Sequence, residues 1–253
     1  MGSLRGAVAL VTGAGQGVGQ GIALALAGAG ATVAVVGRTE AKLAATCELV
    51  RERGGRAEPF PVDVTDTAAV PPLVERVMRE FGGIDVLVNN AYTGSYGPLL
   101  SMSDEDFQRG FHSAPFAAFA FMKACHPHLK ARGGGSIVNL VTSAMVRWDT
   151  STYGAYAAAK QALRSLTRTA ASEWGRDGIR VNAIAPHALS PGLAAWTERN
   201  PEEAAEFVKS IPLGRIGDCE ADIGRAVAAL VGPDLRYLTG ATVPLDGGQA
   251  FFS

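Results

Sequence analysis

The chain has few cysteines, and no pattern that would use them together. Cys47, Cys125 and Cys219 are the only three among 253 residues, and no Cys-x-x-Cys pair occurs. This spacing suits neither a disulfide framework nor a zinc site, and it favours thiols that stay reduced. No apolar run approaches the roughly 20 residues needed to cross a bilayer, and the first strand starts too early to leave room for a signal peptide. We therefore expect a cytoplasmic protein without a membrane segment.

The sequence also lacks an excess of charge of either sign. It has 23 Lys and Arg against 24 Asp and Glu, a formal net charge of −1, with 19% charged and 47% hydrophobic residues. A polyanionic partner such as nucleic acid is therefore not expected, and a small polar or apolar molecule is the better candidate ligand.

Short apolar runs alternate with longer stretches of helical periodicity. The runs are nearly continuous in aliphatic and β-branched residues, as in a parallel sheet covered on both faces. They span residues 7–12, 31–36, 84–89, 136–141 and 179–185, and the helical patterns span 17–29, 40–53, 66–81, 103–131, 152–175 and 219–231. This order predicts a single doubly wound α/β domain over residues 1–253, with about seven strands. Residues 187–217 break the rhythm and predict a partly helical substrate flap or, alternatively, a plain surface excursion.

A glycine-rich turn, TGAGQGVG, joins the first strand to the first helix. Gly13, Gly15, Gly17 and Gly19 would let the backbone turn sharply and approach a diphosphate, which the amides at the helix N-terminus stabilise. The spacing departs from G-x-G-x-x-G, because Val18 stands where the third glycine would fall. The turn therefore predicts a dinucleotide site, with tight packing as the alternative.

The end of the second strand bears on the choice of cofactor. An acidic residue at this point binds the adenosine ribose hydroxyls, whereas a basic one accommodates a 2′-phosphate. Here Gly37 is followed by Arg38 and Thr39, and an arginine offers a planar fork of donors to a phosphate. We predict NADP(H) in preference to NAD(H), unless Arg38 is a solvated surface charge. Asp63, after the third strand, is placed to meet the adenine or to cap the next helix.

Tyr156 and Lys160 lie four residues apart on a predicted helix, so their side chains share a face. An ammonium beside a phenol favours the phenolate and would lower the tyrosine pKa towards the range of a general acid/base. Tyr153 has Ala157 at the matching position and is the weaker candidate. Ser143 follows the fifth strand, at the sheet edge where the glycine turn also lies.

These motifs together resemble the short-chain dehydrogenase/reductase family, in its single-domain branch. TGAGQGVG matches the family's T-G-x-x-x-G-x-G, NNAY at 89–92 resembles N-N-A-G, YAAAK matches Y-x-x-x-K, and LDGG at 245–248 resembles the usual C-terminal strand. The resemblance covers essentially the whole chain. It implies a Rossmann-type fold and an oxidoreductase that transfers a hydride between a nicotinamide cofactor and a carbonyl or secondary alcohol.

The resemblance also implies roles for single residues. Tyr156 would protonate the carbonyl oxygen, Ser143 would orient it, and Lys160 would bind the nicotinamide ribose and lower the tyrosine pKa. Thr12 and Asn89 would hold strands and loops together. The residues expected at the cofactor are Gly13, Gly15, Gln16, Gly17, Val18, Gly19, Arg38, Thr39, Asp63, Val64, Asn90, Ala91, Tyr156, Lys160, Pro186 and His187.

The sequence departs from the family pattern at several positions. Thr142 competes with Ser143 for the role of the catalytic hydroxyl. The spacing of 13 residues between Ser143 and Tyr156 along the sequence favours Ser143. Ala114 stands where relatives carry an asparagine that helps to hold a proton-relay water. Pro115 follows it and should bend the helix, so that freed carbonyls, with Ser113 or His112, would hold the water instead.

Two other departures place bulky side chains near the cofactor, because Tyr92 and His187 replace glycines of the family pattern. The candidate pocket residues are Tyr92, Tyr96, Met145, Trp148, Tyr153, His187 and Trp196. Their aromatic character favours an apolar or ring-containing ketone or alcohol. The alternatives are a 3-oxoacyl carrier-protein reductase and a catalytically weak NADP(H)-binding sensor or assembly subunit. Family members are commonly tetramers, and the alanine-rich faces of 114–124 and 157–171 suit a homotetramer or dimer.

Overall fold

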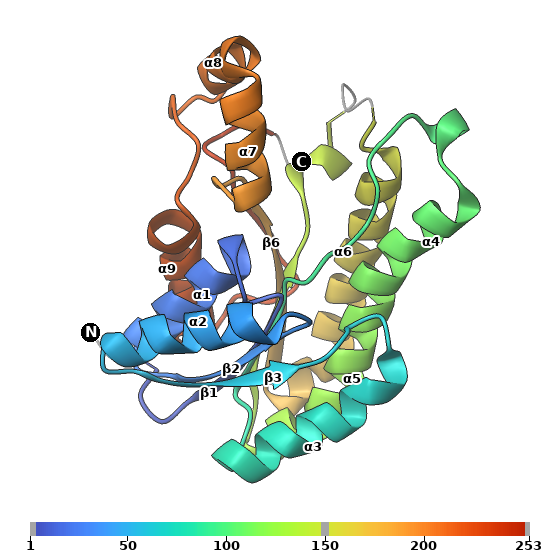
Figure 1. The fold of residues 1–253 in the computed structure, drawn as a ribbon. Helices are drawn as coiled ribbons and strands as arrows, with labels where there is room; N and C mark the ends of the chain where they lie inside the picture. The colour runs from blue at the N-terminus through green and yellow to red at the C-terminus, as the bar shows by residue number, and fades with distance from the viewer. Residues whose placement is uncertain (1–3, 148–151, 251–253) are drawn as a thin grey trace.

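One parallel sheet organises the chain in the computed structural model, which describes residues 4–147 and 152–250. Within these ranges the strand order is β3-β2-β1-β4-β5-β6-β7 (Figure 1). The strands are β1 (Val8–Thr12), β2 (Thr32–Gly37), β3 (Arg56–Pro61), β4 (Val86–Asn89), β5 (Gly135–Leu140), β6 (Ile179–Pro186) and β7 (Thr242–Leu245). The doubly wound α/β fold is confirmed, and the five predicted apolar runs form β1, β2, β4, β5 and β6.

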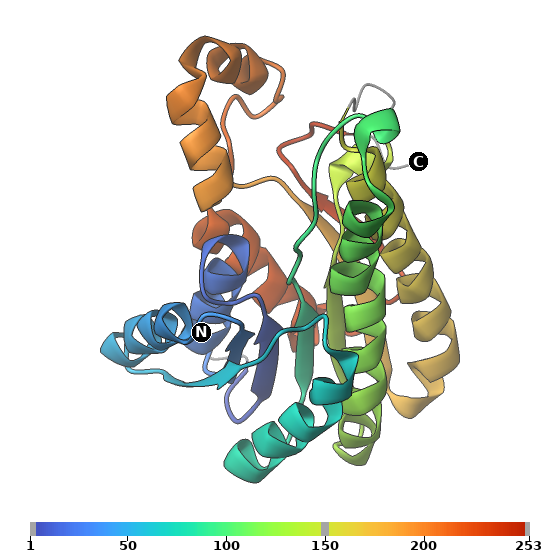
Figure 2. The ribbon, with the colours of Figure 1, turned by 45° about the vertical axis from the view of Figure 1, so that its right-hand side comes forward.

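Helices cover both faces of this sheet (Figures 1 and 2). On one face α1 (Gly17–Gly28), α2 (Glu40–Glu52) and α9 (Arg225–Val231) bury apolar side chains such as Ile22, Leu43 and Val227. On the other, α3 (Val70–Phe81), α5 (Ala117–Ala131) and α6 (Gly154–Trp174) contribute side chains such as Val77 and Phe121. Strands covered on both sides have no polar face, which is why their sequences read as continuous apolar runs.

The predicted helix over 103–131 is broken into three pieces. It begins as α4 (Asp104–Phe111), passes through a π-helical turn at His112–Phe116, and continues as α5. Ser103 caps α4 by accepting a hydrogen bond from the Asp106 amide at 3.1 Å. Pro115 lies inside the π turn and has no amide hydrogen to donate, so the regular ladder of hydrogen bonds cannot pass through it. The bend predicted at Pro115 thus takes the form of a π-helical turn, which is wider than a turn of α-helix.

Two helices stand beyond the carboxyl ends of the strands, α7 (Pro191–Arg199) and α8 (Pro201–Lys209) (Figure 2). They occupy the segment 187–217 and confirm its partly helical character. Ser190 caps α7, and Pro191 opens it with the fixed φ that a first helical turn accepts. The remaining short elements are 3₁₀ turns at Thr67–Ala69, Leu99–Ser101, Ser143–Met145, Gly175–Asp177 and Pro233–Leu235, and a π turn at Cys219–Gly224.

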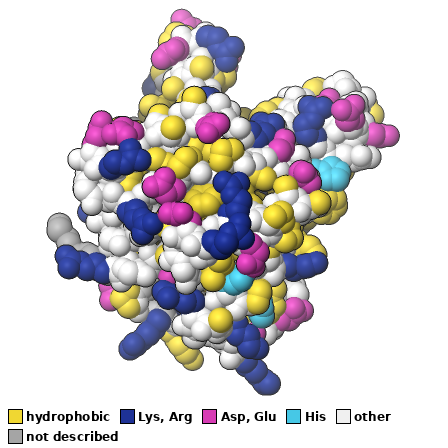
Figure 3. All heavy atoms as spheres, turned by 60° about the horizontal axis from the view of Figure 1, so that its bottom comes forward, with side chains coloured by type: hydrophobic (Ala, Val, Ile, Leu, Met, Phe, Trp, Pro, Cys, Tyr) yellow, Lys and Arg dark blue, Asp and Glu magenta, His cyan; other side chains and the backbone are white. Residues whose placement is uncertain are grey.

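Charged side chains of both signs are interspersed on the face that Figure 3 brings forward. This mixture agrees with the near-zero net charge of the sequence. Within residues 4–147 and 152–250, none of the helices has the length and apolar character needed to cross a membrane.

Candidate active site

The site lies where the strand order reverses, between β1 and β4. Loops leaving two strands in opposite directions open a crevice at the carboxyl edge of such a sheet. The Asn90 side chain ties the two loops together by donating to the carbonyl oxygens of Thr12 and Gly13, at 2.9 and 3.1 Å. The Thr12 hydroxyl accepts from the amides of Asn90 and Ala91 at 3.0 and 3.1 Å. The crevice therefore has a rigid floor.

The glycine turn after β1 forms a cradle that side chains would fill. Gly13 has a φ of +66°, and a Cβ at this position would lie 2.7 Å from the side-chain nitrogen Nδ2 of Asn90. A Cβ on Gly19 would lie 2.3 Å from the Gly13 carbonyl oxygen. Helix α1 begins at Gly17, and Gln16 at its N-cap makes no side-chain cap. The first amides of α1 therefore stay available to an anion. This geometry fits the diphosphate of a dinucleotide.

The end of the crevice beside β2 holds an exposed ion pair between Arg38 and Asp63, with N and O atoms 3.8 Å apart. Asp63 also accepts hydrogen bonds from the backbone amide and hydroxyl of Thr65, at 2.9 and 2.8 Å. Burial pushes the pKa of Asp63 upward, but the Thr65 hydrogen bonds and the Arg38 charge hold it below its ordinary value. Asp66, not Asp63, caps the following 3₁₀ turn by accepting from the Ala68 amide. Of the two sequence-based alternatives for Asp63, capping is thus excluded.

Two hydroxyls follow β5, and they face different partners. Thr142 is a hydrogen-bond partner of the Tyr156 phenol. Ser143, the residue that the sequence favours, is buried and donates its hydroxyl to the Asp246 carboxylate at 2.6 Å. In this arrangement Thr142 is the partner of the Tyr156 phenol, and Ser143 is the partner of Asp246.

Lys160 lies on the same face of α6 as Tyr156, but the two groups do not affect each other's pKa as predicted. Lys160 is 2% exposed and donates to the Leu140 carbonyl oxygen at 2.7 Å. Burial lowers its pKa to about 7. Burial, and next the neighbouring Tyr96, raise the pKa of Tyr156 above its ordinary value, and the Thr142 hydrogen bond opposes this rise. The expected lowering by the ammonium is absent, and burial of the phenol sets the direction of the Tyr156 pKa shift instead.

Three further tyrosines surround Tyr156. Its ring centroid lies 4.7 Å from that of Tyr92, 5.5 Å from Tyr96 and 6.3 Å from Tyr153. Tyr96 and Tyr153 are 55% and 44% exposed, so they lie at the mouth of the crevice. Tyr92 is deeper: burial, and next Tyr96, raise its pKa to about 12. The sequence places these residues in the pocket, and the structure brings them together as one aromatic wall.

The π turn contributes Ser113 and Ala114 behind this wall. The Ser113 hydroxyl donates to the Thr93 carbonyl oxygen at 2.7 Å and accepts from the Thr93 amide at 3.0 Å. Ser113 and Ala114 line a small cavity of about 10 Å³ with Asn89. This volume is near the lower limit for one water molecule. His112 instead packs edge-on against Phe116, on the outer side of the turn. Of the two suggested water partners, only Ser113 therefore faces inward.

His187 follows β6 beside Pro186 and links the sheet to the flap. Its amide donates to the Leu245 carbonyl oxygen, and its ring lies 5.1 Å from that of Phe207, which in turn contacts Trp196 at 6.1 Å. Burial lowers the pKa of His187, while Asp246 opposes that change. Met145 lies in the turn after Ser143, and Trp148 falls outside the described residues.

Sequence reasoning missed Asp246, which fixes Ser143 and also accepts the amides of Gly248 and Ala250, both at 3.1 Å. Ser143 and Asp246 are separated by 103 positions along the chain. The LDGG motif pointed only to a strand, and its aspartate carries no spacing signal that would connect it to β5.

Comparisons with known proteins agree with this geometry. A family model described as enoyl-(acyl carrier protein) reductase matches residues 13–250. A 12α-hydroxysteroid dehydrogenase of Clostridium sp. is 41% identical over 98% of both chains. The chain is a short-chain dehydrogenase/reductase.

Other relatives of this short-chain dehydrogenase/reductase differ in substrate. A 3-oxoacyl-[acyl-carrier-protein] reductase of Thermotoga maritima is 33% identical over 97% of this chain and 98% of its own length. A solved 7α-hydroxysteroid dehydrogenase, in complex with NADH and 7-oxo glycochenodeoxycholic acid, superposes with a TM-score of 0.92 at 30% identity, over 98% of this chain and 95% of its own. A chain from Beutenbergia cavernae, provisionally assigned as an NAD(P)-dependent gluconate 5-dehydrogenase and solved with NADP, gives a TM-score of 0.90 at 32% identity, over 97% of both chains.

The family and the relatives fix the class of reaction. This short-chain dehydrogenase/reductase is an oxidoreductase that interconverts a hydroxyl and a carbonyl group with a nicotinamide cofactor. Its relatives bind either NADH or NADP, so the class alone does not select one of them.

Proposed function

We propose that this enzyme is an NADP(H)-dependent oxidoreductase of ring-containing ketones and secondary alcohols, with Tyr156, Thr142 and Lys160 as its catalytic residues. The observation that carries the proposal is the meeting of the Tyr156 phenol with the Thr142 hydroxyl, beside a glycine cradle shaped for a diphosphate. Thr142 would thereby take the role that the sequence analysis predicted for Ser143.

The nicotinamide ring supplies or accepts the hydride when it is bound. In carbonyl reduction Tyr156 donates its phenolic proton to the substrate oxygen, and Thr142 donates a hydrogen bond to the same oxygen, which orients it. In alcohol oxidation Tyr156 takes the proton back. The aromatic wall around Tyr156 keeps water from the reacting atoms and strengthens these interactions. Lys160 would hold the ribose hydroxyls beside Tyr156, and with a pKa of about 7 it can bind or release a proton near neutral pH.

Arg38 supports NADP(H) over NAD(H). The Arg38 side chain is 59% exposed at the end of β2, and its N–O distance to Asp63 is 3.8 Å, which is longer than a hydrogen bond. A 2′-phosphate could therefore recruit the guanidinium without breaking a strong ion pair. Gly37 presents no acidic side chain to the ribose hydroxyls.

The pocket wall supports a ring-containing substrate. Tyr92, Tyr96 and Tyr153 offer flat apolar faces around the reacting phenol, and Trp196 and Phe207 form a second aromatic pair on the flap. Apolar ring systems bury large areas against such faces. The 12α- and 7α-hydroxysteroid dehydrogenases among the relatives act on substrates of this kind, so a hydroxysteroid or a similar fused-ring alcohol is the first choice.

A substrate panel tests the proposal. The purified enzyme is assayed with 7-oxo and 12-oxo bile acids and with a 3-oxoacyl thioester, each with NADPH and with NADH, while cofactor binding is followed by fluorescence. We expect NADPH-dependent turnover of a ring ketone. Turnover of the acyl thioester alone would make the enzyme a 3-oxoacyl reductase. Cofactor binding without turnover of any ketone or alcohol would make it a sensor or assembly subunit.

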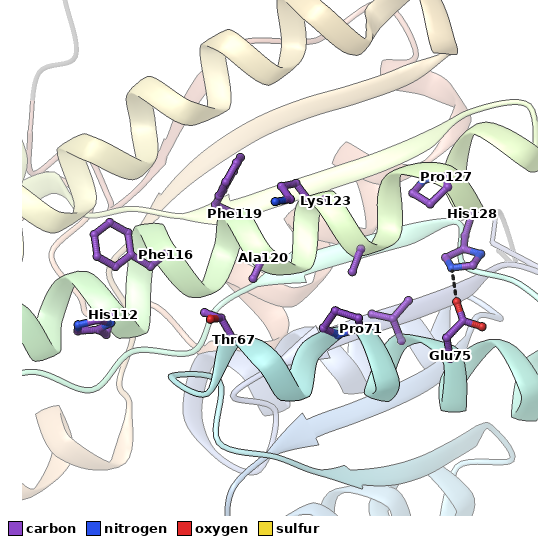
Figure 4. Close-up of a pocket in the computed structure, with 12 residues that line it drawn as sticks. Thr67, Pro71, Glu75, His112, Phe116, Phe119, Ala120, Lys123, Pro127 and His128 are labelled. Atoms are coloured by element: carbon purple, nitrogen blue, oxygen red, sulfur yellow. Dashed lines mark ion pairs between the residues drawn. The ribbon is translucent and has the colours of Figure 1, made fainter.

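A homo-oligomer is part of the proposal. A groove of about 640 Å³ runs between α3 and α5, from the π turn to His128 (Figure 4), and Phe116 and Phe119, which line it, are 50% and 45% exposed. Figure 4 also shows the His128–Glu75 ion pair at the far end of the groove, with an N–O distance of 3.2 Å. Exposed aromatic residues on one helix face suit contact with a second copy. Sedimentation should give a dimer or tetramer, and Phe119→Glu should shift it towards the monomer.

A cytoplasmic location also belongs to the proposal. Cys47 and Cys125 are free and buried, and burial raises the pKa of both thiols, Cys47 to about 11 and Cys125 to about 12. Thiols of this kind stay protonated at neutral pH and suit a reducing compartment.

A further inference from the structure

The surroundings of Lys160 lack the usual partner of a buried lysine. Its Nζ atom donates to the Leu140 carbonyl oxygen at 2.7 Å, and among the described residues no carboxylate pairs with it. Two aromatic rings face the ammonium instead: the centroid of Tyr92 lies at 5.2 Å and that of Tyr156 at 5.9 Å. The hydroxyls of these two tyrosines are the titratable groups next to Lys160. Tyr92 comes from the loop after β4, and Tyr156 comes from α6. A buried ammonium with one neutral acceptor needs further stabilisation.

Tyr92 is held in place by its ring and not by its hydroxyl. The hydroxyl is buried and finds no hydrogen-bond partner among the described residues. It lies next to two glycines: a Cβ on Gly94 would come within 2.2 Å of it and one on Gly110 within 3.2 Å. The ring packs edge-on against Tyr156 at 4.7 Å. Burying an unpaired hydroxyl is unfavourable, so the position must gain from the aromatic face itself.

We propose that Tyr92 is a positioning residue whose ring face stabilises the Lys160 ammonium by a cation–π interaction. The centroid distance of 5.2 Å is within the range of about 6 Å in which such interactions act, and they are strongest where water is excluded. Tyr92 stands next to the π turn, where Ala114 has no polar side chain to offer. The ring thereby keeps Lys160 charged and directed at the Leu140 carbonyl. Its value for catalysis rests on the proposed role of Lys160, but the contact itself does not.

The titration of Lys160 can be measured directly. The chain has five lysines, Lys42, Lys123, Lys130, Lys160 and Lys209, and all but Lys160 are exposed. In protein labelled with ¹³C at the lysine ε-carbon, one of the five NMR signals should titrate near pH 7. Lys160→Met assigns the signal by removing it.

Variants at Tyr92 decide the proposal. Tyr92→Phe keeps the ring and should leave the Lys160 midpoint in place. Tyr92→Leu keeps apolar bulk without a π face and should lower the midpoint by about one pH unit or more. An unchanged midpoint in Tyr92→Leu overturns the proposal. A drop in both variants also overturns it, because the hydroxyl and not the ring would then be responsible.

A second series guards against misfolding of Tyr92→Leu. Phenylalanine, then its mono-, di- and trifluorinated analogues, are placed at position 92; fluorine withdraws the charge of the ring face with little change of shape. We expect the Lys160 midpoint to fall stepwise with fluorination, and a flat series contradicts the proposal. The substrate panel is independent of this titration. Absence of turnover in the panel would refute the proposed oxidoreduction but would leave the cation–π contact standing. A Lys160 midpoint that does not change with fluorination would refute the cation–π contact but would leave the proposed oxidoreduction standing.

Discussion

The turn after β1 and the loop after β5 form the two sides of the same crevice, yet they are built differently. In the turn after β1 the backbone makes the site, because Gly13 and Gly19 leave no room for a Cβ and the amides of α1 point outward. In the loop after β5 side chains make it. Thr142 has extended backbone angles, φ −149° and ψ 146°, so it and the adjacent Ser143 point to different partners.

This difference determines how much each side tolerates. A backbone cradle depends on the size of a few residues and is indifferent to their chemistry. A side-chain site depends on which of two neighbouring hydroxyls reaches Tyr156. A shift of one residue along the chain would place the other hydroxyl beside the phenol. We therefore expect substitutions after β5 to change the reaction rate, and substitutions after β1 to change stability and cofactor affinity.

The largest effect is expected at Tyr156. Tyr156→Phe removes the proton donor and should lower kcat by about 10²- to 10⁴-fold, because proton transfer by a positioned group contributes that much. Cofactor affinity, measured by fluorescence titration, should change little. Tyr153→Phe is the matched control, since Tyr153 is 44% exposed and precedes the helix. Equal losses in the two variants would remove Tyr156 from its role.

The two hydroxyls after β5 give the sharpest contrast. Thr142→Ala should lower kcat by about 100-fold through loss of a donor to the substrate oxygen, and Thr142→Ser should restore most of it. Ser143→Ala should lower the free energy of unfolding by about 1.5–3 kcal/mol, because it deletes a buried hydrogen bond to the Asp246 carboxylate, with a smaller effect on kcat. The reverse result, a rate defect at Ser143 alone, would return the catalytic role to that residue.

The glycine cradle can be tested within one helix. Gly19→Ala places a Cβ 2.3 Å from the Gly13 carbonyl oxygen, and the resulting shift should lower the free energy of unfolding by about 1–3 kcal/mol and weaken cofactor binding. Gly28→Ala in the same helix meets nothing within 4 Å and should stabilise the protein by about 0.4–1 kcal/mol. Chemical denaturation measures both. If Gly19→Ala bound the cofactor normally, the cradle would not be the diphosphate site.

The smallest expected effect is at Arg38, at the exposed end of the crevice. Arg38→Ala should raise the KM for NADPH about tenfold and leave the KM for NADH nearly unchanged, which corresponds to the loss of one exposed charged hydrogen bond. A parallel change for both cofactors would show that Arg38 does not contact the 2′-phosphate.

The sequence predicted what depends on local pattern and missed what depends on packing. Continuous apolar runs located β1, β2, β4, β5 and β6, and Pro115 predicted the irregularity before α5. The pairing of Ser143 with Asp246 joins loops 103 positions apart, and no local pattern contains it. The pKa of Tyr156 is likewise set by burial among other tyrosines, and the Tyr156–Lys160 spacing alone gave the wrong direction.

The most direct test of the proposed chemistry is a crystal structure of the enzyme with NADP and a ring alcohol that it oxidises. We predict that the substrate oxygen lies within hydrogen-bond distance of both the Tyr156 Oη and Thr142 Oγ1 atoms, while Ser143 remains bonded to Asp246. A substrate oxygen held by Ser143, or one beyond reach of Tyr156, would contradict it.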